Sequence, residues 1–200
     1  MPRFEYGTRE MEYLKSRDRK LGEVIDRMGV LECEVIPDPF AALIFSIVGQ
    51  QISSKAADTV WNRLQALVGD ITPEAVTMTD PQAIQSCGMT HRKAGYIRGI
   101  AEAICEQRTD FQSLHNLSDR DVIRRLSELP GVGPWTAEML LIFSLHRYDV
   151  VSFDDLAIRR GMMTLYGLDS LTKEQFQRYR KRYSPYGSVA SLYLWELSLE

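Results

Sequence analysis

The 200-residue sequence predicts an all-α fold. Apolar residues recur at helical spacing along nearly the whole chain, as in residues 11–28, where Leu14, Leu21 and Ile25 fall on roughly one face. The alternation that marks strands is hard to find, and residues 150–153 form the only short run that suggests one. Residues that start and stop helices punctuate the pattern throughout.

Capping and breaking residues place the individual helices. Thr72-Pro73 and Asp80-Pro81 each open a short helix, because proline is favoured just inside a helix start. We expect helices within 11–28, at 40–48, from Ser53, at 73–78, from 81, from about 91, from Ser118 to 129, from 134 to about 146, from about 155, from Thr172, and from 187 to near Trp195.

The composition excludes several classes of protein. Hydrophobic residues make up 44% and charged residues 26%, which is typical of a globular domain and not of a disordered chain. No apolar run is long enough to span a membrane, and the N-terminus has no apolar secretory segment, so we expect a cytoplasmic protein, nucleoid-associated if prokaryotic. The net charge of −3 argues, on its face, against a nucleic-acid partner.

The metal-binding residue types are few and scattered. Cys33, Cys87 and Cys105 are odd in number and contain no Cys-x-x-Cys pair, which excludes a disulfide framework or a four-cysteine zinc or iron–sulfur site within the chain. The three histidines are equally dispersed. We therefore expect no metal and no cofactor.

The sharpest local signal is the string LPGVGPWTA at residues 129–137. Two glycines separated by one residue allow backbone angles closed to other residues and let another backbone come near. The N–H groups of such a turn, with those of the helix that follows, form an anion site suited to a DNA phosphate. A bare Gly-x-Gly would indicate a plain connector, but the full string favours a DNA-binding helix-hairpin-helix that includes Gly131, Val132, Gly133 and Thr136.

Two adjacent carboxylates lie about twenty residues beyond the hairpin. Asp154 as N-cap and Asp155 as a first-turn residue would explain the pair structurally. Taken alone, that explanation is favoured, whereas the nearby hairpin shifts the balance towards a catalytic role.

Together these motifs resemble the helix-hairpin-helix–Gly/Pro–Asp DNA glycosylases. Residues 45–53 resemble the VGQQIS segment of that family, and residues 88–97 its GLS-x-RKA-x-YI segment. Residues 183–195 resemble the end of the 3-methyladenine DNA glycosylase II (AlkA-like) branch. The resemblance implies a single two-lobed helical unit over 1–200 with the active-site cleft between the lobes. One lobe would be about 1–38 plus 121–200, with hairpin and aspartate, and the other about 39–120.

The resemblance also implies an activity: a monofunctional glycosylase that flips out alkylated purines, such as 3-methyladenine and 7-methylguanine, and excises them from duplex DNA by hydrolysis in base excision repair. Asp155 corresponds to the essential aspartate, whose carboxylate stabilises the positive charge that develops on the deoxyribose or activates water. Asp154 remains a cap and local support. Members that also cut the backbone carry a Schiff-base lysine where this chain has Trp135, so we expect no lyase activity.

The same resemblance suggests the residues of a base pocket. Trp135 and Tyr186 match aromatic positions that suit a cationic purine, although both could be core aromatics. Met139 lies where the branch often has an aromatic, which leaves the substrate range open.

A flipped base leaves a gap in the duplex that a wedge residue should fill. The resemblance points to the turn after residue 48. Gln51 is the first candidate, with Gln50 and Ile52 as alternatives, and a solvent-facing glutamine is an equally acceptable reading.

The expected partner is double-stranded DNA that contains damaged bases, bound by a monomer without an obligatory protein partner. Basic charge is concentrated at 91–100 and 171–190. Such runs are usually solvated faces, and the second, which includes the residues just before Pro185-Tyr186, could also contact phosphates. Two alternatives stay open: a glycosylase for deaminated or oxidised bases such as hypoxanthine, and a non-catalytic protein that binds DNA structures through the hairpin.

Overall fold

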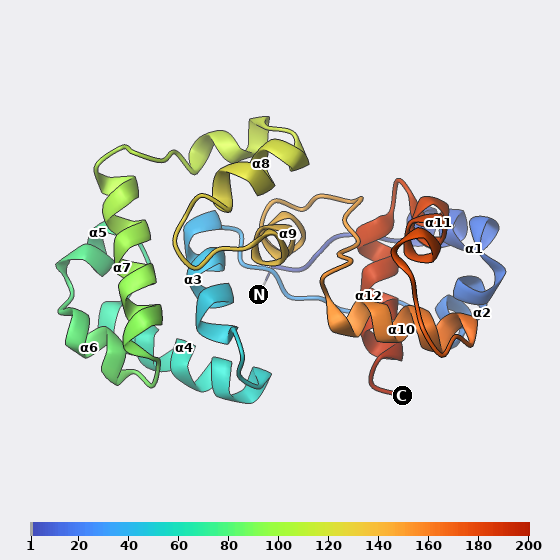
Figure 1. The fold of residues 1–200 in the computed structure, drawn as a ribbon, viewed down its shortest axis with the longest axis horizontal. Coiled ribbons are helices and arrows are strands. Elements are labelled where there is room, and N and C mark those ends of the chain that lie inside the picture. The colour runs from blue at the N-terminus through green and yellow to red at the C-terminus, as the bar shows by residue number, and fades with distance from the viewer. Residues whose placement is uncertain (1) are drawn as a thin grey trace. The chain divides into compact units, whose positions relative to one another are not determined.

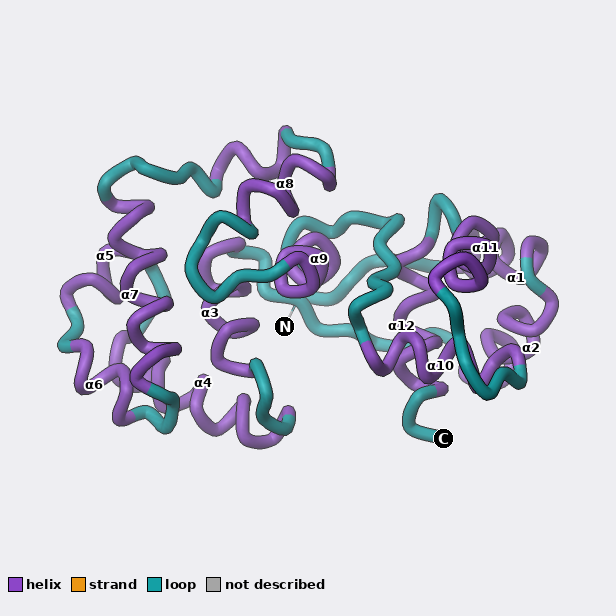
Figure 2. The backbone as a smooth tube through the Cα atoms, viewed as in Figure 1, coloured by secondary structure: helices purple, strands orange, loops and turns teal. Residues whose placement is uncertain are grey.

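The computed structural model describes residues 2–200, and this part of the chain is helical almost throughout (Figure 1). No strand occurs in it, as Figure 2 shows, and the only ladder-like contact is an isolated antiparallel bridge between Arg3 and Glu34. The 150–153 run that suggested a strand is a connection between helices. The all-α prediction is confirmed. No helix of these residues is both long and apolar enough to cross a membrane.

The chain divides into two compact units, one made of Met1–Val35 with His146–Glu200 and the other of Ile36–Leu145. The first unit contains α1 (Thr8–Arg17), α2 (Arg19–Met28), α10 (Leu156–Tyr166), α11 (Lys173–Tyr183) and α12 (Gly187–Leu197). The second contains α3 (Pro39–Gly49), α4 (Ser54–Val68), α5 (Pro73–Met78), α6 (Pro81–Ser86), α7 (His91–Cys105), a 3-10 helix (Gln112–Asn116), α8 (Asp119–Leu126) and α9 (Pro134–Phe143).

The first unit is built on the contact between α10 and α12. Gly161 of α10 makes this contact close, because a Cβ there would lie 1.9 Å from the carbonyl oxygen of Leu194. Asp18 splits the expected 11–28 helix into α1 and α2: its Oδ1 accepts the N–H of Leu21 at 3.1 Å and caps α2. Its Oδ2 accepts from Tyr166 Oη at 2.6 Å and from Arg182 at 2.9 Å, so this buried carboxylate ties three elements together.

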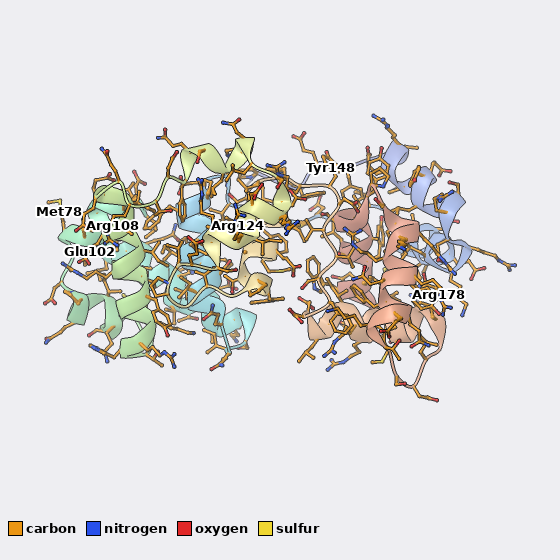
Figure 3. All side chains as sticks on the ribbon, turned by 45° about the horizontal axis from the view of Figure 1, so that its top comes forward. Met78, Glu102, Arg108, Arg124, Tyr148 and Arg178 are labelled. Carbon is orange, nitrogen blue, oxygen red and sulfur yellow. The ribbon has the colours of Figure 1, made fainter. Side chains whose placement is uncertain are left out.

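The second unit is centred on α3, which is almost wholly apolar and buried as expected. The α7 helix packs against α5 and α6, and α9 packs against both α3 and α8. At its periphery the side chain of Met78, labelled in Figure 3, is 88% exposed.

The unit boundary differs from the expected one, because residues 121–145 belong to the second unit and not with the chain ends. The packing of α9 on α3 explains the difference, and two hydrogen bonds between the first and last residues of this unit add to it. The N–H of Ile36 donates to the carbonyl of Phe143 at 3.0 Å, and Ser144 Oγ donates to the carbonyl of Pro37 at 3.1 Å. The hairpin and Asp155 therefore lie in different units.

Candidate functional site

The hairpin connects α8 to α9 and uses its two glycines differently. Gly131 has a φ of +80°, and a Cβ there would lie 2.2 Å from Cδ2 of Tyr96. Gly133 is the N-cap of α9 with a φ of −97°, and a Cβ there would meet nothing within 4 Å. Contrary to the expectation, only the first glycine adopts a backbone conformation closed to other residues, whereas the second leaves open space outside the loop.

The other two predicted hairpin residues point inward. Val132 and Thr136 are both buried, and Thr136 Oγ1 accepts a hydrogen bond from Nε2 of Gln50 at 3.3 Å. These side chains support the loop from within. Any anion bound here would meet the backbone of the turn and the start of α9, where proline occupies the first position.

The turn that follows α3 lies beside this hairpin in the same unit. Gln50 turns its side chain towards the hairpin and donates to the carbonyl of Gly131 at 3.0 Å. Gln51 and Ile52 are exposed, and Gln51 has a φ of +60°. Of the three candidate wedge residues, Gln50 is thus engaged with the protein, while the other two face outward.

A cavity of about 430 Å³ lies between this turn, the hairpin and the start of α7. Lys93 reaches into the turn and donates to the carbonyls of Val48 at 2.9 Å and Gln50 at 2.6 Å. Burial lowers the pKa of its ammonium group. The cavity is lined by Gln50, Gln51, Ile52, Thr90, Arg92, Lys93, Tyr96 and Gly131.

Asp155 lies in the first unit, at the N-terminus of α10. It is 7% exposed, and its Oδ1 accepts the N–H of Ile158 at 2.9 Å, so Asp155 itself is the N-cap. The expectation that Asp154 caps this helix is wrong, because the helix begins one residue later and Asp154 is exposed before it. The carboxylate of Asp155 is therefore held in one orientation against the positive end of a helix.

Phe153, two residues before this aspartate, packs its ring against neighbouring side chains. Its ring packs edge-on against Phe176, with centroids 5.1 Å apart. The guanidinium of Arg159 and the ammonium of Lys173 lie 5.3 Å and 5.8 Å from the same ring. Two cations on one ring fix the backbone immediately before Asp154 and Asp155.

The predicted base-pocket residues divide between the two units. Trp135 and Met139 are one turn apart on α9, so they share a face; the indole is half-buried and Met139 is buried. Tyr186 is the N-cap of α12 and makes edge-on ring contacts with Tyr13 at 5.2 Å and with Tyr148 at 6.3 Å. Tyr148 is labelled in Figure 3, and burial raises the pKa of its hydroxyl.

The basic side chains of segment 91–100 make hydrogen bonds within the protein. Lys93 is bound to the turn, and Arg98 pairs with Glu102 at 2.8 Å. Arg92 donates to the hydroxyl of Tyr96. In α11, by contrast, Lys181 is exposed, and so is Arg178, which Figure 3 labels.

Sequence reasoning missed Lys93 and Tyr96 as parts of the site. Their spacing of three residues on α7 places them on one face, which was an available signal. Their targets, however, are backbone groups more than thirty residues away, which no local pattern reveals. No group of three or more histidine, cysteine or acidic side chains suited to a metal occurs within residues 2–200.

Comparison with known proteins places this arrangement in a family. The model of the HhH-GPD superfamily of base excision DNA repair proteins matches residues 44–185. DNA-3-methyladenine glycosylase 1 of Schizosaccharomyces pombe is 36% identical over 166 residues, which cover 80% of this chain and 73% of the relative. The DNA-3-methyladenine glycosylase of Saccharomyces cerevisiae is 30% identical and covered to 68%, with 82% of this chain matched.

Solved structures agree with the sequence comparison. The DNA-3-methyladenine glycosidase of Bacillus halodurans has a TM-score of 0.83 at 35% identity and covers 99% of this chain, with 93% of its own length matched. The Schizosaccharomyces pombe 3-methyladenine DNA glycosylase in complex with abasic DNA has a TM-score of 0.84 at 32% identity, with 94% of this chain and 96% of the neighbour covered. The chain therefore belongs to the HhH-GPD superfamily of base excision DNA repair proteins.

Proposed function

We propose that the protein is a monofunctional DNA glycosylase that excises alkylated purines, such as 3-methyladenine and 7-methylguanine, from duplex DNA. The observation that carries the proposal is the orientation of Asp155: a mostly buried carboxylate fixed at a helix N-terminus in a chain of the HhH-GPD superfamily. The names of the relatives, which are DNA-3-methyladenine glycosylases, support the substrate class.

The chemistry follows from a fixed negative charge. Cleavage of the N-glycosidic bond transfers the bonding electrons to the departing base and builds positive charge on the deoxyribose. The carboxylate of Asp155 stabilises that charge, and water then adds to the sugar and leaves an abasic site. An alkylated purine already carries a positive charge, so it leaves without prior protonation by an acid of the protein.

Base recognition is assigned to the aromatic residues. The indole of Trp135, with Met139 one turn away, offers a soft and electron-rich face to a cationic purine, and Tyr186 offers another. Trp135 supplies no amine, so no Schiff base forms at this position and the DNA backbone stays intact.

Duplex DNA is held through backbone groups and a wedge. The open space beside Gly133 and the N-terminus of α9 suit a phosphate, and the exposed Gln51, or its neighbour Ile52, enters the gap left by the flipped base. The protein acts as a monomer, without a cofactor or an obligatory protein partner.

Substitution of Asp155 tests the mechanism. The Asp155→Asn variant should release methylated bases from treated duplex DNA about a hundredfold more slowly or worse, because it lacks the charge. Release at the wild-type rate would refute the proposed role. A panel of duplexes, each with one lesion, should show faster release of 3-methyladenine and 7-methylguanine than of hypoxanthine, and the reverse order would contradict the substrate class.

A further inference from the structure

We propose that Lys93 is a positioning residue that locks the turn carrying Gln51 against the hairpin, so that the wedge is already formed before DNA binds. The inference rests on the proposed function, because it assigns a device to the step in which Gln51 enters the duplex. Its residues all lie within the second compact unit.

The first step of the argument is what Lys93 binds. The last carbonyl groups of a helix have no partner inside that helix and carry the negative end of its dipole. The ammonium of Lys93 donates to two such groups, the carbonyls of Val48 at 2.9 Å and of Gln50 at 2.6 Å, which flank the end of α3. Its charge is thereby directed to the protein backbone.

The second step concerns the backbone of Gln51. Its φ of +60° is left-handed, which a residue with a Cβ adopts only when its surroundings impose it. The side chain of Gln51 is exposed, so its own contacts do not impose this conformation. The turn around it imposes the conformation: the N–H of Ile52 donates to the carbonyl of Gly49 at 3.4 Å, and Lys93 holds the carbonyl of Gln50 within that turn.

The third step connects the turn to the hairpin. Gln50 donates from Nε2 to the carbonyl of Gly131 at 3.0 Å and to Thr136 Oγ1 at 3.3 Å. Gly131 in turn packs on the ring of Tyr96 so closely that no Cβ would fit. Lys93 and Tyr96 come from one face of α7, so a single helix sets the turn and the hairpin in register.

The expected consequence is a loss of preorganisation when the ammonium is removed. Without Lys93 the turn can sample other conformations, and part of the binding free energy is spent on ordering it. We expect Lys93→Met to weaken binding to DNA with an abasic site by about tenfold or more, as for loss of a hydrogen bond to a charged group. Lys93→Arg, whose guanidinium can donate to both carbonyls, should restore most of the affinity.

A double-mutant cycle distinguishes positioning from general weakening. Binding to duplex with an abasic site, and the fluorescence of a 2-aminopurine placed opposite it, are measured for Lys93→Met, Gln51→Ala and the double variant. If Lys93 acts through Gln51, the double variant should be no worse than Gln51→Ala alone, and both single variants should reduce the fluorescence change. Additive losses, or an unchanged fluorescence response in Lys93→Met, would overturn the proposal.

The salt dependence of binding supplies a second discriminating measurement. A lysine that neutralises a phosphate contributes nearly one unit to the slope of log affinity against log salt. Lys93→Met should leave that slope unchanged, and a slope shallower by about one unit would make Lys93 a phosphate contact and refute positioning. Gln50→Met leaves the ammonium of Lys93 in place but removes the bonds from the turn to the hairpin. It should show the same coupling to Gln51→Ala in a double-mutant cycle, so the test remains available if Lys93→Met fails to fold.

These measurements do not require catalysis. If wild-type protein releases no base but the variants behave as described, the proposed function fails and the positioning role survives. If base release is normal and the cycle is additive, the positioning role fails alone.

Discussion

Substitution can separate the structural role of Asp155 from its proposed chemical role. Its Oδ1 accepts the N–H of Ile158, a bond that the side-chain oxygen of asparagine can also accept. The free energy of unfolding of Asp155→Asn should therefore lie within a few tenths of a kcal/mol of the wild-type value, whereas that of Asp155→Ala should be lower by about 1 kcal/mol. Urea unfolding measures both, and an Asp155→Asn variant destabilised as much as the alanine variant would show that the charge, and not the cap, stabilises the fold.

A buried serine two residues upstream of Asp154 gives a second prediction at this scale. Ser152 Oγ is fully buried and has no hydrogen-bond partner within residues 2–200, whereas Ser191 Oγ lies 3.0 Å from the carbonyl of Val150 and 3.1 Å from that of Gly187. Ser152→Ala should leave the free energy of unfolding unchanged or raise it, and Ser191→Ala should lower it by about 1 kcal/mol. Equal destabilisation of both variants by urea would reveal an unseen partner for Ser152.

At the scale of elements, the two glycines of the hairpin differ in what a Cβ at each position would meet. Gly131→Ala should destabilise the protein by about 2 kcal/mol or more. The backbone there is left-handed, and the new Cβ would lie 2.2 Å from the ring of Tyr96. Gly133→Ala should lose only about 1 kcal/mol, the usual cost of alanine at an N-cap, but should weaken binding to duplex DNA, since its Cβ occupies the open space beside Gly133. Thermal unfolding and DNA titration test the pair, and unchanged DNA affinity in Gly133→Ala would argue against phosphate binding there.

The close contact between α10 and α12 gives the second prediction at the scale of elements. Alanine normally stabilises a helix relative to glycine by about 0.5–1 kcal/mol. Gly95→Ala in α7 should show that gain, because a Cβ there meets nothing within 4 Å. Gly161→Ala in α10 should instead lose about 2 kcal/mol, because its Cβ would collide with the backbone of Leu194. Unfolding curves of the two variants that shift in the same direction would contradict the close α10–α12 packing.

How much of these elements the sequence predicts depends on how local their causes are. Caps such as Thr72 and Thr172 bond to N–H groups three residues away, so the starts of α5 and α11 are predictable from short strings. The sequence alone does not distinguish Asp154 from Asp155 as the cap of α10, because either adjacent aspartate could accept the same kind of bond. The role of Lys93 is not predictable from its neighbours in the sequence, because the carbonyls it binds are more than forty residues distant in the chain.

At the scale of the whole molecule, charge is divided unevenly between the units. The unit of the chain ends carries fifteen basic and fifteen acidic residues, and the hairpin unit carries nine basic and twelve acidic ones. The net charge of −3 therefore belongs to the unit that contains the hairpin, where Lys93 and several arginines are also paired internally. Net charge therefore does not attract DNA to this unit, and in the proposed function the helix N-terminus and the wedge supply more of the binding.

This distribution predicts weak and salt-sensitive binding to undamaged duplex DNA. We expect a Kd in the micromolar range or weaker at physiological salt, as for non-specific contacts with few phosphates. Lys181→Met should make the slope of log affinity against log salt shallower by about one unit, because this lysine is exposed on the basic helix α11. Lys15→Met is the matched control, because its ammonium is already bound to Asp26 at 2.6 Å and Glu12 at 2.9 Å. Nanomolar affinity at high salt, or equal slope changes in the two variants, would contradict this account of how charge is used.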